Sequence, residues 1–215
     1  MALTKVTGQG IGSIDTEGTI KLDGNYPTGT NNVALGNTAL DDGSLSGGNN
    51  TAIGSAALSS TTSGADNTAV GFNVLSTNQT GSSNTAIGKS ALSLNTGGSN
   101  VAVGRSALEN NSTASNNTAV GKDALIANTT GHSLVAVGDS ALKANTTALA
   151  NTAVGRAALE ATTTGASNTA VGRSALQVNT TGAENVAVGL SALDANTTGS
   201  NNVAVGRNAL SGNTT

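Results

Sequence analysis

The sequence contains no cysteine, one proline and two aromatic residues, Tyr26 and Phe72. The lack of cysteine excludes disulfides, cysteine-based metal sites and thiol catalysis. So few aromatic side chains exclude the thick core that a conventional domain of 215 residues would bury. The chain must therefore be held together by something other than bulky side chains.

Charged residues are also scarce, at 10% of the chain, and the formal net charge is −3 at pH 7. A nucleic-acid-binding protein normally carries a basic surface, so we expect no nucleic-acid partner. No segment approaches the roughly 20 apolar residues of a membrane span. The start of the chain shows no apolar run followed by a small-residue cleavage site. We therefore expect no membrane insertion, no signal peptide and synthesis in a cytoplasm.

What the chain does contain is a repeat. A triplet of Ala, an aliphatic residue and Gly recurs eleven times, at a spacing of 17 residues except for one step of 18 and one of 16. Leu stands four residues after the Gly of every copy. Such self-similarity is typical of a solenoid, in which each unit buries its apolar residues against its neighbours. The glycines of the triplets are Gly36, Gly54, Gly71, Gly88, Gly104, Gly121, Gly138, Gly155, Gly172, Gly189 and Gly206.

Each repeat has the composition of a short strand followed by turns. The segment NVAVG at residues 100–104 has the branched residues of a strand, and the Asn-Thr-Thr-Gly segments have turn chemistry. Eleven coils stacked in parallel about 4.8 Å apart would form a rod on the order of 50 Å long. Repeated Asn and Thr would then bond to their copies one coil away. The sequence therefore predicts an all-β repeat solenoid over residues 31–215, preceded by a separate segment at residues 1–30 that lacks the repeat.

The second limb of each coil, such as RSAL at residues 105–108, allows two interpretations. Ala and Leu favour a short helical turn, and Arg105 and Glu109 have opposite charges four residues apart. In an extended strand these two residues would lie roughly 13 Å apart and would pair only between coils or chains. A strand and a helical turn both stay open on the sequence alone.

The alternation of side chains along the strand predicts an oligomer. In residues 100–104, Val101 and Val103 point to one side of the strand, and Ala102 and Gly104 point to the other. Neither side carries a charge, and a lone roll would expose one of them as an apolar stripe. We expect the Val and Ile columns to pack inward with Leu, and the narrow Ala and Gly face to press on identical chains in a homotrimer. The predicted repeat core comprises Ala102, Val103, Gly104, Leu108, Ala119, Val120, Gly121 and Leu125.

The repeat resembles two families of fibrous proteins. The unit NTAVGRSAL followed by NTTGSNN is similar to the head repeats of trimeric autotransporter adhesins of the YadA type, which carry an N-S-V-A-I-G-type motif. It is more similar still to the Ala-Val-Gly and Asn-Thr-Thr-Gly arrays in tail-fibre proteins of bacteriophages. The segment ALTKVTGQGIGSI at residues 2–14 resembles the N-terminal segment that attaches such fibres to the tail.

These resemblances imply a left-handed parallel β-roll that forms an intertwined or side-by-side homotrimer. They also imply a structural protein of the virion, joined to the tail through residues 1–30 and used for attachment to a host-cell glycan or protein. The adhesins carry a secretion signal and a membrane anchor, which are not seen in this sequence. The phage tail fibre is therefore the favoured interpretation.

One column of repeat positions carries six of the nine Lys and Arg residues. These cations directly follow the Gly of the triplet. A row of cations on a rigid rod is a candidate contact for a polyanionic host glycan, and the alternative is a solvated edge that discourages aggregation. The six residues are Lys89, Arg105, Lys122, Arg156, Arg173 and Arg207.

The sequence offers no candidate catalytic residue. His132 is the single histidine, and it occupies a turn without a recurring catalytic partner. The acidic residues form no regular Asp ladder of the kind that binds calcium in some β-rolls. We therefore expect a protein that is not an enzyme and binds no cofactor or metal. The alternatives to a fibre are a structural spacer and an ice-binding solenoid, although adjacent Thr side chains pointing to opposite faces argue against ice binding.

Overall fold

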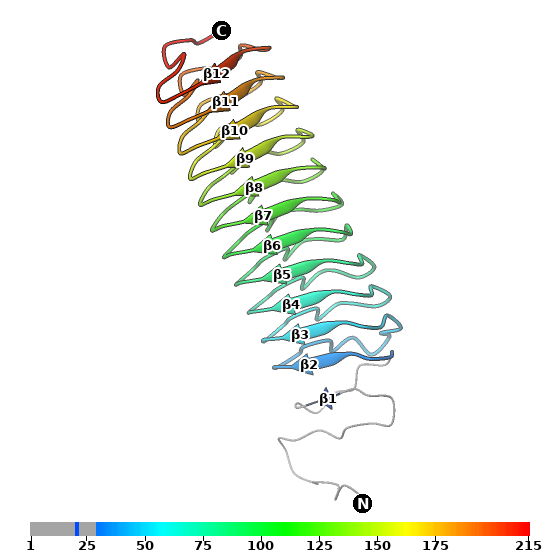
Figure 1. The fold of residues 1–215 in the computed structure, drawn as a ribbon. Coiled ribbons are helices and arrows are strands. Elements are labelled where there is room, and N and C mark those ends of the chain that lie inside the picture. Colours follow the sequence, from blue (N-terminus) through cyan, green and yellow to red (C-terminus); the bar gives the residue numbers. More distant parts are fainter. Residues whose placement is uncertain (1–19, 22–28) are drawn as a thin grey trace, which may run out of the picture.

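A computed structural model describes residues 20–21 and 29–215, so the predicted attachment segment at residues 1–30 lies almost entirely outside the described residues. The strands form one sheet in chain order, shown in Figure 1. They are β1 (Ile20–Lys21), β2 (Val33–Leu35), β3 (Thr51–Ile53), β4 (Thr68–Val70), β5 (Thr85–Ile87), β6 (Val101–Val103), β7 (Thr118–Val120), β8 (Val135–Val137), β9 (Thr152–Val154), β10 (Thr169–Val171), β11 (Val186–Val188) and β12 (Val203–Val205).

From β2 to β12, each strand pairs in parallel with the equivalent strand of the adjacent coil, and β1 pairs in parallel with β2. Ala102 lies opposite Ala86 on one side and opposite Ala119 on the other, so equivalent positions of the repeat are in register. Figure 1 shows β2 to β12 stacked along one side of a rod, with the turns of each coil closing behind them. The predicted all-β solenoid with coils of about 17 residues is therefore confirmed.

The second limb is neither a strand nor a helix; its residues form consecutive turns. Ser106 and Leu108 have φ angles of 57° and 53°, and the equivalent residues have positive φ in all eleven coils. A strand or an α-helix requires negative φ throughout. The helical preference of Ala and Leu is overridden because backbone N–H groups of this limb find acceptors in the adjacent coil, as Leu108 N–H does at Ala124 O, 3.0 Å away.

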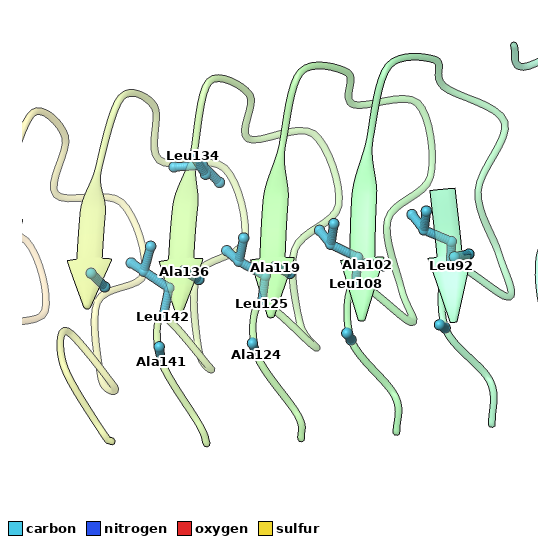
Figure 2. Close-up of a cluster of buried hydrophobic side chains, with 14 of the residues drawn as sticks. Leu92, Ala102, Leu108, Ala119, Ala124, Leu125, Leu134, Ala136, Ala141 and Leu142 are labelled. Carbon is cyan, nitrogen blue, oxygen red and sulfur yellow. The ribbon is translucent and has the colours of Figure 1, made fainter. Parts of the chain in front are cut away.

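The interior of the rod is a narrow column of Ala and Leu. Figure 2 shows Leu92, Leu108, Leu125 and Leu142 in a row beside the strands. These leucines have no measurable exposed surface, and neither has Ala102 in the middle of β6. Since every coil supplies the same residues, the core continues along the rod and does not thicken at any point.

The two faces of the strand are reversed relative to the sequence prediction. Of the predicted core, Ala102, Leu108, Ala119 and Leu125 are buried. The inward positions of Val103 and Val120 were predicted wrongly: both side chains point outward, and Val120 retains 36% of its surface exposed. Gly104 and Gly121 are half-buried in the turn after the strand. The reason is space, since the leucines of the second limb fill the interior and leave room for a methyl group at the strand.

Two columns of Asn side chains line the interior beside this core. In the first column, Asn100 Oδ1 accepts a hydrogen bond from Asn117 N–H at 3.0 Å, and Asn100 Nδ2 donates to Ala114 O at 2.9 Å across the same coil. In the second column, Asn128 Nδ2 donates to Asn111 Oδ1 at 2.8 Å. The predicted coil-to-coil bonding of Asn is confirmed. These bonds satisfy buried amide and carbonyl groups that would otherwise destabilise a core without water.

The second Asn column is interrupted at Thr162. The Thr162 hydroxyl donates to Asn179 O at 3.0 Å, so its hydrogen is not offered to the preceding coil. Asn145 Oδ1 is buried without a hydrogen-bond partner; Asn78 Oδ1 is in the same state, although an Asn follows it on the next coil. A buried acceptor in this state lowers stability.

Replacing Thr162 with Asn should repair this column. The new amide can donate to Asn145 Oδ1, and we expect the free energy of unfolding to rise by about 1 kcal/mol. Urea denaturation followed by circular dichroism measures the change. The matched control is Asn128→Thr, which creates the same interruption in an intact part of the column and should lower the free energy of unfolding by about 1 kcal/mol or more. Destabilisation by both substitutions would contradict the role assigned to the column.

Candidate binding surfaces

The outward side of β2–β12 is a long strip without charge. The first and third residues of each strand point outward, while the middle Ala is buried. The first residue is Thr or Val, and the third residue is Val, Ile or Leu. We call this strip the sheet face. Its third-position side chains are Leu35, Ile53, Val70, Ile87, Val103, Val120, Val137, Val154, Val171, Val188 and Val205.

The sheet face is large for an exposed apolar surface. Eleven coils about 4.8 Å apart and three strand residues about 3.3 Å apart give a strip roughly 50 Å long and 10 Å wide. An uncharged patch on the order of 500 Å² matches the largest apolar patch of a typical soluble protein, and such patches are often interaction sites. The parallel, in-register array also repeats the same side chains at a fixed spacing along the rod. The sheet face is therefore the first candidate binding surface.

The second candidate is the row of predicted cations, which we call the cation column. All six residues are exposed and occupy the turn directly after a strand, at one edge of the sheet face. Lys89, Arg105 and Lys122 lie on three consecutive coils, and Arg156 and Arg173 lie on two. The coil spacing of about 4.8 Å separates neighbouring members along the rod. The structure thus brings the predicted residues into one line, interrupted by Asp139 and Leu190.

Asp123 neutralises some of this charge, on its own coil and on the preceding one. Arg105 Nη2 lies 3.1 Å from Asp123 Oδ1, and Lys122 Nζ lies 3.6 Å from Asp123 Oδ2. The predicted alternative partner of Arg105 is not used, since Glu109 makes no ion pair with it. Asp123 could not be identified as this partner from the sequence, because it pairs across one coil, at a separation of 18 residues from Arg105.

The other cations carry uncompensated charge. Among the described residues, no carboxylate lies within ion-pair distance of Lys89, Arg156, Arg173 or Arg207. Lys89 Nζ instead lies 6.0 Å from the centre of the Phe72 ring. Phe72 occupies the same repeat position as the cations and is 55% exposed. An aromatic ring therefore lies next to the first cation of the column, on the preceding coil. The position of Phe72 directly after Gly71 could have identified it from the sequence.

Comparison with protein-family models, with curated proteins and with solved structures finds no match to this chain. Over the described residues, no helix has the length and apolarity to cross a membrane. The two surfaces of the rod therefore provide the basis for inferring a function.

The described part of the chain gathers no group of three or more His, Asp or Glu side chains that could hold a metal ion. His132 Nδ1 lies 3.2 Å from the hydroxyl of its neighbour Ser133. A Ser and His contact between adjacent turn residues lacks the third group that orients the base in hydrolytic triads. These side chains do not assemble into a catalytic arrangement.

Proposed function

We propose that the chain is a fibre protein of a bacteriophage tail, in which three copies pack side by side into a stiff rod that attaches the virion to its host cell. The main support for this proposal is the sheet face, an uncharged strip that runs the length of the rod. The resemblance of the repeat to tail-fibre arrays supplies the biological setting. The proposal includes no catalytic activity.

Self-association explains why the sheet face is uncharged in every coil. A strip of roughly 50 by 10 Å has a planar area on the order of 500 Å², which each copy would share between its two neighbours; this is less than the roughly 800 Å² that each partner buries in a standard two-chain interface. Val, Ile and Thr side chains at a fixed spacing suit contact with an identical array. Closed symmetry around one axis covers the strip on every copy and leaves no open contact for further growth.

The interface in this proposal differs from the one that the sequence suggested. The Ala residues of the strands fill the interior of the coil and cannot contact another chain. The contact falls to the outward Val, Ile and Thr side chains, with the sheet faces of three copies turned toward a common axis. The cation column then lies at the margin of this contact and stays open to solvent.

Lysine on the sheet face should dissociate the oligomer. We expect a Val120→Lys, Val137→Lys variant to sediment as a single chain in analytical ultracentrifugation, because two ammonium groups per copy would be buried near the axis. Its circular dichroism should match the unmodified protein, since both side chains point away from the core.

The matched control for this pair is Thr130→Lys, Thr147→Lys, which adds the same charges at exposed turn positions of neighbouring coils. This variant should keep the mass of the oligomer. If both pairs sediment alike, the sheet face is not the contact between copies.

Attachment can be tested on whole bacterial cells. Fluorescently labelled protein should adsorb to strains that carry its receptor, and the Val120→Lys, Val137→Lys variant should adsorb more weakly because a single chain loses multivalent contact. Equal adsorption of the two proteins would contradict a role for the oligomer in attachment. Oligomers that adsorb to no bacterial surface would favour a spacer.

The Thr-rich turns do not favour the ice-binding alternative. In the Asn-Thr-Thr-Gly turns, the first Thr hydroxyl donates to a carbonyl of the next coil, as Thr129 does to Thr146 O at 3.0 Å. The second Thr of the pair, such as Thr130, is exposed. The two hydroxyls therefore do not form paired outward columns, and half of them are used to join the coils.

A further inference from the structure

We infer that the cation column is a binding site for an extended acidic polysaccharide, a polymer with one carboxylate on each sugar, which lies along the axis of the rod. This inference rests on the proposed attachment function and names the class of receptor. The site comprises the ring of Phe72 and the cations from Lys89 to Arg207.

The geometry of the column favours a linear ligand with evenly spaced charges. Cations on adjacent coils repeat about every 4.8 Å along the rod. Consecutive sugars of an extended polysaccharide advance by a similar distance and are rotated about the polymer axis. Every second or third carboxylate therefore turns toward the rod, where it can lie between cations of adjacent coils. Phosphates of a duplex strand follow one another every 3.4 Å or so along the axis and fall out of step with the coils. A single line of cations on a chain of net charge −3 also lacks the broad basic surface of nucleic-acid-binding proteins.

The lack of ion-pair partners at two of the arginines also favours an anionic ligand. Arg156 and Arg173 stand on adjacent coils with no carboxylate of the described chain at ion-pair distance. Like charges on adjacent coils repel each other, and an anion bound between them would remove that repulsion. Guanidinium groups bind carboxylates through paired hydrogen bonds, which makes arginine well suited to a uronic acid.

Phe72 is the observation that separates a sugar from other anions. Its exposed ring occupies the same repeat position as the cations and is adjacent to Lys89. The apolar C–H face of a pyranose ring can stack on an aromatic ring, whereas a phosphate chain has no apolar face to offer. The ring and the cations together match a polymer whose units each carry an apolar face and a negative charge.

Asp139 is the position at which the site is expected to bind a polyanion least well. It occupies the column between Lys122 and Arg156, where it repels a polyanion laid along the rod. A ligand that spans both groups of cations must pass this carboxylate. Removal of its charge should therefore strengthen binding.

Isothermal titration calorimetry with polygalacturonate as the probe tests the inference. We expect the unmodified protein to bind polygalacturonate. It should show no binding to the fully methyl-esterified polymer, which has the same backbone without the charge. Arg156→Gln, Arg173→Gln should weaken binding roughly tenfold, a change consistent with two exposed charge pairs. Asp139→Asn should strengthen binding severalfold, and Phe72→Ala should weaken it without altering its dependence on salt.

The matched control is Lys143→Gln, which removes an exposed cation outside the column and should leave the affinity unchanged. Equal losses from Lys143→Gln and from the arginine variant would overturn the inference in favour of nonspecific charge attraction. Equal or tighter binding of polyphosphate with no effect of Phe72→Ala would overturn it in favour of a general polyanion site.

Sedimentation of the same samples separates this inference from the proposed fibre. An oligomer that does not bind polygalacturonate overturns the polysaccharide site and leaves the fibre intact. A single chain that binds polygalacturonate through the arginines overturns the trimer and leaves the site intact.

Discussion

Replacing Gly121 with Ala is expected to unfold the coils around it, with a loss of about 3 kcal/mol or more in the free energy of unfolding. Gly121 has a φ of 139°, which a residue with a Cβ rarely adopts. A Cβ at this position would lie 2.4 Å from Gly138 O and 2.6 Å from Gly138 C. The Gly138 backbone cannot retreat easily, because its N–H donates to Val120 O at 2.7 Å. Urea denaturation measures the loss.

The control for this substitution is Gly43→Ala. No atom lies within 4 Å of a Cβ built at Gly43, and its φ is outside the range that favours glycine. We expect a change within about 0.5 kcal/mol for this exposed position. A mild effect of Gly121→Ala would contradict the close stacking of the turns after the strands.

Replacing Leu125 with Ala is expected to lower the free energy of unfolding by about 2–5 kcal/mol. Leu125 is fully buried between Leu108 and Leu142, and a narrow core has few other side chains that can move into the space. Since Ala has the same difficulty with positive φ as Leu, the backbone conformation of this residue contributes little to the difference. Denaturation by urea or heat, followed by circular dichroism, measures the loss.

Leu94→Ala is the control for this cavity, because Leu94 is 49% exposed on the outside of its coil. Its loss should stay below about 1 kcal/mol. Similar losses for Leu94 and Leu125 would show that the leucine column is not the core of the rod.

The period of the sequence predicted the architecture because equivalent residues must stack. Ala, Gly and Leu occupy fixed positions in all eleven copies. Only parallel, in-register coils place each of these residues beside the same residue of the next copy. Asn100 and its copies could be assigned to ladders for the same reason, and hydrogen bonds such as Asn117 N–H to Asn100 Oδ1 confirm this.

The inward face of the strand could not be predicted by alternation alone. Both sets of side chains in residues 100–104 are small or apolar, so the pattern allowed Val103 or Ala102 to be inside. The deciding factor is the volume that Leu108 occupies on the opposite limb, which depends on its φ of 53°. Leucine disfavours that conformation, so propensity suggested a strand or a helical turn instead.

The cation column could be predicted because its members share one repeat position. Its partners could not, because they depend on contacts between coils. Asp123 follows Lys122 in the sequence, yet it also pairs with Arg105 on the preceding coil. The spacing within one repeat contains no information on such a contact until the register of the coils is known.

We propose that an uncharged sheet face joins three copies of this chain, and light scattering of the purified protein measures the resulting mass in solution. The expected mass is three times the chain mass of 20.6 kDa, together with a β-rich circular dichroism spectrum. A mass of 20.6 kDa with the same spectrum would contradict a trimer joined through the sheet face, because a stable solenoid would then leave this face open to water.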